Sequence, residues 1–547
     1  DRLRDGQEAV MGRVLAGLST LALMPTGAGK SLCYQLPAVL LDGRTVVISP
    51  LIALMKDQCD ALRELGIDCV QVHGGLAAAE ASAAREALAD GAARIVFTTP
   101  EQLAHPEFVE LLAKHPVALL VVDEAHCLSQ WGFDFRPAFL RIPMVMEALG
   151  RPAVLALTAT ATEPVVDDII ELLPIPRAGV IGTDLFRPNL HYRAENFSRA
   201  EDKQARLIEL VRESTGSGLV YVATVKAAEQ LHDALAATGE SVGLYHGRLG
   251  APRRHAAQDA FMNGEVRVMI ATNAFGLGID KPDIRFVIHH QLPSGLDAYC
   301  QESGRAGRDG EVAVCTLLFI EGDRAVQRFF LAGRYPELNE FRAVIDALRT
   351  PPPEDAGWTA DALVDRLGHA RKVSVALNLL CRRGLVRDED GRLRLGDTPI
   401  GDIELEPLAM SSRDKAERDR AMLERMIAYA QSGRCRWGLL LEHLEGRAVP
   451  MRCGTCDNCL RLAAHEAAGE QRDAVEPIVV SPSPGFEIGQ RVRTRRHGLG
   501  DVVAADTVSV TVAFPNGQRR SFQPQFVSAV AAARSRRAPV ATPVHDM

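Results

Sequence analysis

The stretch "MPTGAGKS", Met24–Ser31, has the residue types of a phosphate-binding loop. Gly27 and Gly29 let backbone N–H groups close around a phosphate. Lys30 can neutralise the β and γ oxygens of a nucleotide, and the Ser31 hydroxyl can ligate magnesium. The first position is methionine where the standard pattern has glycine, and the alternative is a glycine-rich turn with an incidental lysine. The candidate nucleotide ligands are Thr26, Gly27, Ala28, Gly29, Lys30 and Ser31.

Two carboxylates follow a separate apolar run in "ALLVVDEAH". Asp123 is expected to hold magnesium through water, and Glu124 is expected to orient the water that attacks the γ-phosphate. Acidic residues at a strand end are also found as simple solvated charge. Paired with a phosphate loop, these two predict ATP hydrolysis.

A second polar motif, "QESGRAGRDG", begins at Gln301. Gln301, Arg305 and Arg308 can reach toward a nucleotide, and an arginine there can stabilise the charge that develops in phosphoryl transfer. The motif alone is a weak signal. It complements the phosphate loop by supplying the cationic half of a nucleotide site.

Four of the eleven cysteines are clustered with the spacing C-x17-C-x2-C-x2-C. This spacing suits a tetrahedral all-thiolate zinc site. Disulfides are the alternative, but a reducing compartment and the short C-x2-C spacings both disfavour them. With four thiolates and no open position, the zinc is expected to be structural. The predicted ligands are Cys435, Cys453, Cys456 and Cys459.

The stretch "LSQWGFDFRPAFL", residues 128–140, places one Trp and three Phe in a chain that is only 5% aromatic. Glycine, aspartate, arginine and proline interrupt the run, so a loop is predicted in place of a buried strand. Phe139 sits among Ala138, Leu140 and Ile142 and is expected to belong to the core.

Short apolar runs that end in polar motifs and are followed by helical stretches predict an α/β fold. Because the runs are almost continuously apolar, they favour parallel sheets covered on both faces. The motifs lie at the carboxyl ends of the runs, where open α/β sheets bind ligands. Two sheets are predicted, one from residues 19–24, 45–49, 93–99, 118–125 and 153–160, the other from residues 218–223, 241–246, 267–272, 286–290 and 314–319.

The remaining part of the chain contains segments with different sequence patterns. After a proline-rich break at 350–357, Thr359 can cap a helix, and Val373, Leu377 and Leu380 share one face of the next helix before a small hairpin. This pattern favours a winged helix over an unrelated helical insert. Near the end, alternating apolar and polar residues with Gly and Asn-Gly turns predict a small β-barrel.

The predicted organisation has seven parts. They are two RecA-like lobes (1–186 and 187–336), a winged-helix-like domain (337–408), a zinc module (409–466), a linker (467–484), a small β-barrel (485–532) and a basic flexible tail (533–547).

The net charge of −8 argues mildly against nucleic acid as a partner, but charge is localised. Residues 490–547 hold nine arginines against three acidic residues, a net charge of +6. We find no apolar run of about 18 residues that could span a bilayer, so no membrane role is expected. A cytoplasmic, nucleoid-associated location is the default expectation.

The phosphate loop, "DEAHCLSQWGFDFRP", "ATNAFGLGIDKPDIRFVIHH", "QESGRAGRDG" and "CGTCDNC" together resemble the RecQ family of superfamily 2 ATP-dependent DNA helicases, over roughly residues 1–336 and 411–462. The resemblance implies a 3′-to-5′ translocase that unwinds forked or branched DNA in repair and recombination, with ATP, magnesium and zinc as cofactors. Arg4 and Gln7 in "LRDGQ" match the family's adenine-recognition motif.

The resemblance also implies that the aromatic-rich loop contacts single-stranded DNA and couples its binding to hydrolysis. Trp131 and Phe135 can stack on bases without sequence preference, as a motor on arbitrary DNA requires. Polar residues at strand ends can bond the sugar-phosphate backbone, although ordinary turn capping is an equal alternative for each. The candidate DNA contacts are Trp131, Phe133, Phe135, Arg136, Ser49, Thr98, Thr99, Thr272 and Asn273.

The chain departs from the family's pattern at three points. Phe133 stands where the family usually has histidine, the winged-helix candidate precedes the zinc module, and no helical C-terminal nucleic-acid-binding domain is visible. In its place, residues 491–522 are similar to the Tudor-like tail of bacterial UvrD-type helicases, which suggests RNA polymerase or a repair protein as a partner.

Two rival functions have different requirements. An RNA helicase would share the core motifs, but the aromatic loop and the four cysteines favour DNA. A nucleic-acid-binding scaffold with a dead motor would require the loss of Lys30, Glu124 or Arg308, and all three are present.

Overall fold

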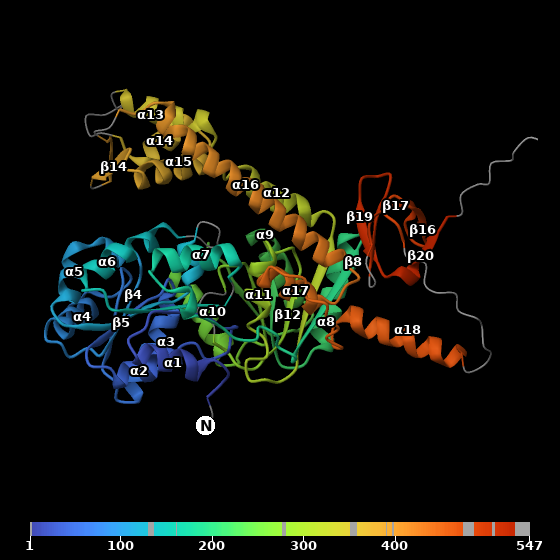
Figure 1. The fold of residues 1–547 in the computed structure, drawn as a ribbon, viewed down its shortest axis with the longest axis horizontal. Helices are drawn as coiled ribbons and strands as arrows, with labels where there is room; N and C mark the ends of the chain where they lie inside the picture. Colours follow the sequence, from blue (N-terminus) through green and yellow to red (C-terminus); the bar gives the residue numbers. More distant parts are fainter. Residues whose placement is uncertain are drawn as a thin grey trace, which may run out of the picture. The chain divides into compact units, whose positions relative to one another are not determined.

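The computed structural model describes residues 3–129, 136–159, 161–275, 280–350, 358–389, 391–396, 399–473, 486–505 and 509–530 (Figure 1). They divide into two compact units. The larger unit runs to Ala430 and includes Arg436–Asp457, whereas the smaller comprises Gln431–Cys435 and the residues from Asn458 onward. Each unit is described by itself.

The first lobe of the larger unit is built on a parallel sheet with the strand order β3-β4-β2-β5-β6-β1-β7. Its central strands are apolar on both faces, as predicted, because helices cover both sides. The strands are β1 (Thr20–Leu23), β2 (Arg44–Ile48), β3 (Cys69–Val72), β4 (Ile95–Thr98), β5 (Val117–Val122), β6 (Ala153–Thr158) and β7 (Val180–Gly182).

Two separate hydrophobic clusters fill the spaces between this sheet and its helices. One lies under α1 (Gln7–Leu15), α2 (Leu32–Leu40) and α3 (Ile52–Glu64), on one side of the sheet in Figure 1. The other lies under the helices α4 (Ala78–Ala89), α5 (Pro106–Ala113), α6 (Ile142–Ala148) and α7 (Glu163–Leu172). The sheet is therefore held rigidly from both faces.

The second lobe repeats this design with the strand order β10-β11-β9-β12-β13-β8, again all parallel. Its strands are β8 (Leu190–Phe197), β9 (Ser217–Tyr221), β10 (Val242–Tyr245), β11 (Val268–Ala271), β12 (Ile284–His289) and β13 (Ala313–Ile320). Its helices are α8 (Ala200–Glu213), α9 (Val225–Ala236), α10 (Ala251–Met262), α11 (Leu296–Ser303) and α12 (Asp323–Ala332).

The sequence did not predict β3, β7 or β8. Strand β8, "LHYRAENF", carries charged and polar residues and so lacks the apolar run by which the other strands were identified. It lies at the edge of its sheet, where one side of the strand has no neighbouring strand.

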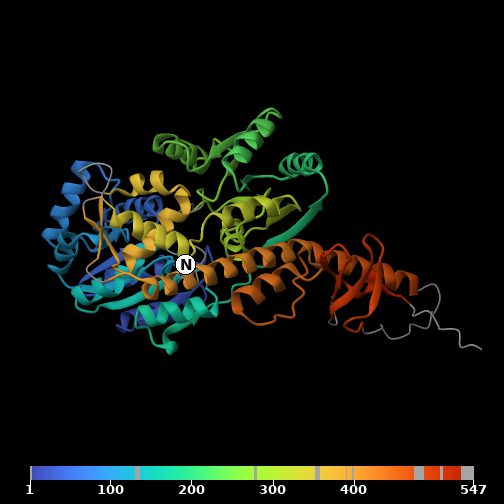
Figure 2. The same cartoon turned by 90° about the horizontal axis from the view of Figure 1, so that it is seen from above.

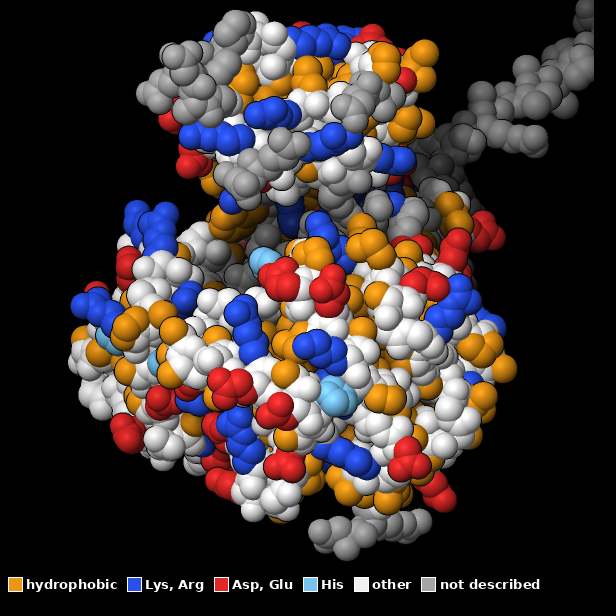
Figure 3. Space-filling model, turned by 90° about the vertical axis from the view of Figure 1, so that its left-hand side faces the viewer, with side chains coloured by type: hydrophobic (Ala, Val, Ile, Leu, Met, Phe, Trp, Pro, Cys, Tyr) orange, Lys and Arg blue, Asp and Glu red, His pale blue; other side chains and the backbone are white. Residues whose placement is uncertain are grey.

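The segment after the second lobe has the helices and hairpin of a winged helix. Helices α13 (Leu338–Arg349), α14 (Ala360–Leu367) and α15 (Ala370–Arg382) precede the antiparallel pair β14 (Val386–Glu389) and β15 (Arg392–Leu395). Thr359 caps α14 by accepting a 3.2 Å bond from the Ala362 N–H. Exposed arginines include Arg366, Arg371, Arg383, Arg387 and Arg394, and Figure 3 shows Lys and Arg side chains gathered over this segment, at the top of the view.

A long helix, α16 (Asp402–Gln431), follows and is drawn in orange in Figure 2. The next helix, α17 (Arg436–Glu445), packs against the free edge of β8. Trp437 Nε1 donates to the Leu190 carbonyl (3.0 Å), and the Asp457 carboxylate accepts from the Ala194 N–H (3.1 Å). These bonds satisfy backbone groups of an edge strand that no neighbouring strand can pair.

The smaller unit contains most of α18 (Asp457–Asp473) and an antiparallel sheet with the order β19-β18-β17-β16-β20. Its strands are β16 (Arg491–Thr494), β17 (Gly498–Ala505), β18 (Val510–Ala513), β19 (Arg519–Phe522) and β20 (Val527–Ala529). Alternation places Val492 in the core and the flanking Arg491 and Arg493 outside. Where the sequence predicts a small β-barrel, the structure has an antiparallel sheet with β19 and β20 as its end strands.

Helices in the described parts of the chain are all too short or too polar to cross a membrane.

Candidate ATP and zinc sites

The phosphate loop lies between β1 and α2, at the carboxyl edge of the first sheet. Gly27 has φ +84° and Gly29 has φ +77°, a left-handed conformation that glycine adopts without strain. Side chains would also not fit, since a Cβ on Gly29 would lie 2.6 Å from Gln7 Nε2 and one on Gly27 would lie 3.1 Å from Arg308 Cγ. The two glycines therefore permit both the turn and the close approach of other residues.

Arg4 and Gln7 contact the phosphate loop directly. The Gln7 amide donates to the carbonyls of Ala28 and Gly29, each at 3.0 Å, and its oxygen accepts from the Arg4 N–H at 2.8 Å. The Arg4 guanidinium donates to the Gly27 carbonyl. The two residues matched to adenine recognition thus lie beside the nucleotide loop.

Lys30, Asp123 and Glu124 meet where β1 and β5 end. Burial lowers the pKa of Lys30, while the nearby carboxylates of Glu124 and Asp123 act in the opposite direction. Burial, reinforced by the Glu124 carboxylate, raises the pKa of Asp123 to about 7. Charged groups of both signs lie together here and are half-buried, so a bound ion or phosphate would strongly affect their protonation.

Glu124 is held in an unusual backbone conformation, with φ +50° and ψ +47°. This left-handed region is uncommon for a residue other than glycine, and such conformations cluster at functional sites. The carboxylate oxygen Oε2 lies 3.4 Å from His126 Nδ1. It is buried and has no hydrogen-bond partner among the described residues.

The second lobe supplies Gln301 from α11 and Arg305 and Arg308 from the turn that follows. Both guanidiniums have a buried Nε without a hydrogen-bond partner within the described chain. Burial lowers the pKa of Arg308, which pairs with Asp280. Two desolvated cations that lack partners at these atoms are suited to an anion.

One cavity is lined by side chains of both lobes. Of the predicted ATP-site residues, the structure brings Thr26, Gly27, Gly29, Lys30, Ser31, Asp123, Glu124, Gln301, Arg305 and Arg308 together around it. Three further polar residues that line the cavity were not singled out from the sequence: Tyr34, Gln58 and Asp280. Gln58 donates to Ser31 Oγ at 3.0 Å. Asp280 lies within "ATNAFGLGIDKPDIRFVIHH", one of the stretches that resemble the helicase family. Its acidic side chain in that stretch could have identified it as a candidate site residue.

The residues present fit a magnesium nucleotide. The unpartnered arginine atoms suit phosphate oxygens, and the paired carboxylates beside the Ser31 hydroxyl are the oxygen ligands that magnesium prefers.

The predicted DNA contacts have mixed surroundings. Trp131, Phe133 and Phe135 lie outside the described residues. Phe139 is fully buried in the core of the first lobe, as expected. Arg136 is half-buried and its backbone N–H donates to the Cys127 carbonyl at 3.0 Å.

Two of the strand-end hydroxyls bond within their own lobe. Ser49 donates to Asp123 Oδ2 and Thr98 donates to the Val72 carbonyl, each at 3.1 Å. Thr99 and Thr272 are buried, whereas Asn273 is exposed. A role in DNA contact stays a prediction for all five residues.

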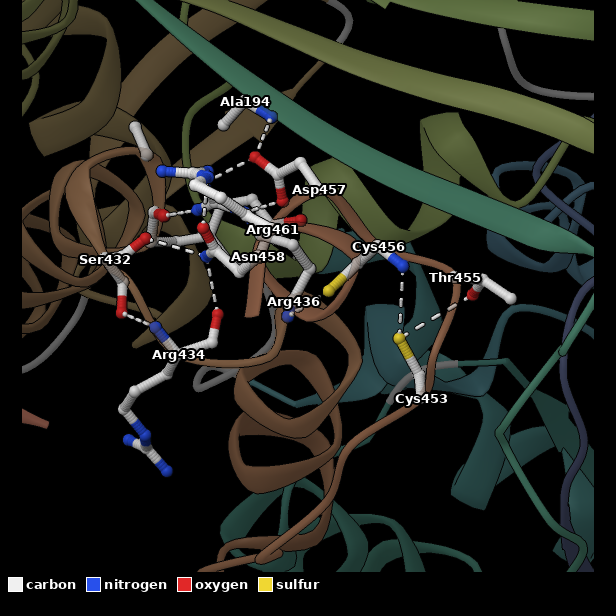
Figure 4. Close-up of polar contacts among 12 residues, drawn as sticks. Ala194, Ser432, Arg434, Arg436, Cys453, Thr455, Cys456, Asp457, Asn458 and Arg461 are labelled. Atoms are coloured by element: carbon white, nitrogen blue, oxygen red, sulfur yellow. Dashed lines mark hydrogen bonds and ion pairs between the residues drawn. The ribbon is translucent and has the colours of Figure 1, made fainter. Parts of the chain in front are cut away.

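The four clustered cysteines form a ready metal site, with all four sulfur atoms within 4.8 Å of one another. Backbone N–H groups point at two of the sulfurs, as Figure 4 shows for one pair. Cys456 N–H donates to Cys453 Sγ at 3.3 Å, and Arg436 N–H donates to Cys456 Sγ at 3.4 Å. Because such bonds stabilise thiolates, the cluster fits zinc.

Family models match three parts of the chain. A DEAD/DEAH box helicase model matches residues 4–169, a helicase conserved C-terminal domain model matches 202–310, and a RecQ zinc-binding model matches 401–460. The two lobes, their shared cavity and the four cysteines therefore define a DEAD/DEAH-box helicase with a zinc module.

Curated relatives narrow the class. The chain is 34% identical over 480 residues to the ATP-dependent DNA helicase RecQ of Synechocystis sp. (strain ATCC 27184 / PCC 6803 / Kazusa), a match that covers 84% of this chain and 96% of that protein. It is 41% identical over 359 residues to RecQ of Bacillus subtilis (strain 168), covering 64% of this chain and 60% of that protein. The chain belongs to the RecQ family of ATP-dependent DNA helicases.

A solved structure shares the fold at much lower identity. The crystal structure of the DUF1998 helicase MrfA bound to DNA has a TM-score of 0.50 and 19% identity, and it covers 72% of this chain and 57% of that one. This likeness concerns the fold alone.

Proposed function

We propose that this chain couples ATP hydrolysis to 3′-to-5′ movement on single-stranded DNA and unwinds duplexes during DNA repair and recombination. The observation that carries the proposal is the cavity in which Lys30, Asp123 and Glu124 of one lobe face Arg305 and Arg308 of the other. A site completed by two lobes links the chemistry of the nucleotide to the relative position of the lobes.

Within this proposal each residue has a role. Lys30 and the loop amides bind the β and γ phosphates, and Ser31 and Asp123 hold magnesium, which neutralises phosphate charge when bound. Glu124 orients the attacking water, and its Oε2, which has no hydrogen-bond partner among the described residues, can accept a hydrogen bond from that water. Arg305 and Arg308 stabilise the charge that develops on the transferred phosphoryl group.

DNA is the proposed substrate because the curated relatives are DNA helicases by name. RNA is the second candidate, since the two-lobed core alone does not distinguish them. We place the enzyme in the cytoplasm with the chromosome. The domain boundaries given above, and the remaining site residues, are part of the proposal.

The C-terminal sheet is the least constrained part of the proposal. Its similarity to a Tudor-like tail supports contact with RNA polymerase or a repair protein. Outward arginines such as Arg491, Arg493 and Arg519 give it a basic surface that favours an acidic partner.

The central test measures ATP hydrolysis with single-stranded DNA and RNA of equal length, and unwinding of duplexes with 3′ or 5′ tails. We expect stimulation by DNA and unwinding of the 3′-tailed substrate. Lys30→Ala and Glu124→Gln should abolish hydrolysis while DNA affinity stays within several-fold, because phosphate chemistry and DNA binding use different side chains. Wild-type turnover in either variant would reject this nucleotide site, and equal stimulation by RNA would reject the substrate assignment.

A further inference from the structure

Helix α11 carries one side of the ATP cavity and is held by residues outside the second lobe's sheet. Gln301 on this helix lines the cavity, and Arg305 follows the helix end by two residues. The helix is only eight residues long, and its N-cap residue, Gly295, has no side chain with which to cap it. Its position therefore depends on packing and on side-chain contacts.

One such contact joins α11 to α17 of the zinc module. His443 Nε2 lies 3.0 Å from Asp297 Oδ1, and both side chains are buried. Asp297 is in the first turn of α11, where the helix dipole favours a carboxylate. His443 Nδ1 has no hydrogen-bond partner in the described part of the chain, so the bond to Asp297 is the polar contact that orients the ring.

The contact lies directly behind the cavity. Asp297 and Gln301 are four residues apart, so they lie on one stripe of α11, a single turn from each other. The same helix is packed through Tyr299 against Tyr429 of α16, with ring centroids 5.2 Å apart. Glu302 bonds to His289 of β12 at 2.8 Å. Both α16 and α17 thus contact the helix that presents Gln301.

Helix α17 is itself firmly anchored. Arg436 is almost fully buried, and its guanidinium donates to both Asp457 carboxylate oxygens at 2.9 and 3.0 Å (Figure 4). Asp457 and Trp437 in turn bond to the edge strand β8. Because α17 is fixed to the sheet by these contacts, a hydrogen bond from it can fix α11 as well.

We propose that α17 is a brace for the arginine side of the ATP cavity, and that His443 and Asp297 are positioning residues for ATP hydrolysis. The proposal rests on the function proposed above. Through the bond between His443 and Asp297, the zinc module contributes to ATP hydrolysis by positioning α11.

The test compares variants of the full chain at saturating single-stranded DNA. His443→Leu should lower kcat for ATP by about 10-fold or more, since small misplacements of catalytic groups are costly. KM for ATP and the zinc content should stay at wild-type values, because neither phosphate binding by the loop nor the cysteines are altered. His443→Gln should restore most of kcat, because its amide N–H can still donate to Asp297.

A double-variant measurement separates positioning from general damage. If the two residues act through one bond, His443→Leu combined with Asp297→Ala should be no slower than the slower single variant. Glu445→Gln is the matched control, since Glu445 lies on the same helix and pairs with the exposed Arg447; it should hydrolyse ATP at the wild-type rate.

Three results would each overturn the proposal. They are wild-type kcat in His443→Leu, equal losses of kcat in the Leu and Gln variants, and additive losses in the double variant. If His443→Leu does not fold, Asp297→Ala decides the question: it removes the oxygen that accepts from His443, so kcat should fall several-fold, and wild-type kcat would overturn the proposal. Failure of the nucleotide site itself is recognised separately, by continued hydrolysis in Lys30→Ala.

Discussion

Single residues in this protein show how burial shifts side-chain pKa values away from their ordinary range. Asp123 and Lys30 are shifted in opposite directions by the same desolvation, and both shifts oppose charge where a charged ligand is expected. His290, at the end of β12, is a purely structural example. Burial, reinforced by the nearby Lys203 ammonium, lowers the pKa of His290 to about 3.

His290 is expected to make the second lobe acid-sensitive. The unfolded chain binds a proton at this residue below about pH 6.5, whereas the folded lobe does not until about pH 3. Stability is therefore lost as pH falls below 6.5, by about 1.4 kcal/mol per pH unit, or about 2 kcal/mol at pH 5. In His290→Gln the loss of Tm between pH 7 and pH 5 should be smaller than in the wild type.

His105→Gln serves as the control for that comparison, because His105 is exposed and pairs only with the exposed Glu107. An equal loss of Tm in wild type and His290→Gln would show that His290 is not buried in its neutral form.

Among the elements, the segment after β5 contains a core residue, Phe139, close in sequence to residues with an expected role in DNA binding. The short helical turn Pro137–Arg141 places Phe139 in the core of the first lobe, at 0% exposure. The aromatic residues just before it are expected to serve DNA, so two rings a few residues apart would have different functions.

Replacing Trp131 by Ala tests that expectation. If the ring stacks on a base, about 1–3 kcal/mol of contact is lost; stimulation of ATP hydrolysis by DNA should fall while basal hydrolysis survives. If the ring belongs to the core, about 3–5 kcal/mol of stability should be lost and every activity should fall together. Measurement of Tm with basal and DNA-stimulated rates distinguishes the two.

Phe133→His is the companion variant, since it introduces the residue that the family usually has at this position. It should fold normally and keep coupling equal or improved. A folded variant that has lost DNA stimulation would show that coupling in this enzyme is built on the phenyl ring.

At the scale of the whole molecule, every residue proposed for ATP chemistry lies in the larger unit, whereas the C-terminal sheet and the sequence after it have a net positive charge in a chain that is negative as a whole. Cross-strand register places Arg491, Asp501, Ala513 and Arg519 in one row on the outer face of that sheet. The sequence that follows adds three more arginines.

Truncation after Pro484 removes this basic region and should leave the motor intact. DNA affinity should weaken most at low salt, because fewer counterions are released on binding, and the slope of affinity against salt should become shallower. The rate of ATP hydrolysis at saturating DNA should remain that of the full chain. A truncated protein without DNA-stimulated hydrolysis would show that the C-terminal sheet is part of the motor.

The sequence alone determined the features whose residues are close in the chain. A phosphate loop is one continuous turn, three of the zinc ligands fall within seven residues, and apolar runs mark most of the strands, so spacing was sufficient to predict them. Strand β8 was missed because its charged and polar residues form no apolar run, and the side chains that bond to its free edge, Trp437 and Asp457, are more than 200 residues away.

Tertiary structure alone decided which distant groups meet. Lys30 and Arg308 share a cavity although 277 residues separate them, and His443 reaches Asp297 across 146 positions. These residues are brought together because apolar surface is buried on both faces of each sheet. That burial depends on the whole chain and not on local spacing. The same burial determines the pKa shifts, since desolvation comes from neighbours that the linear sequence does not specify.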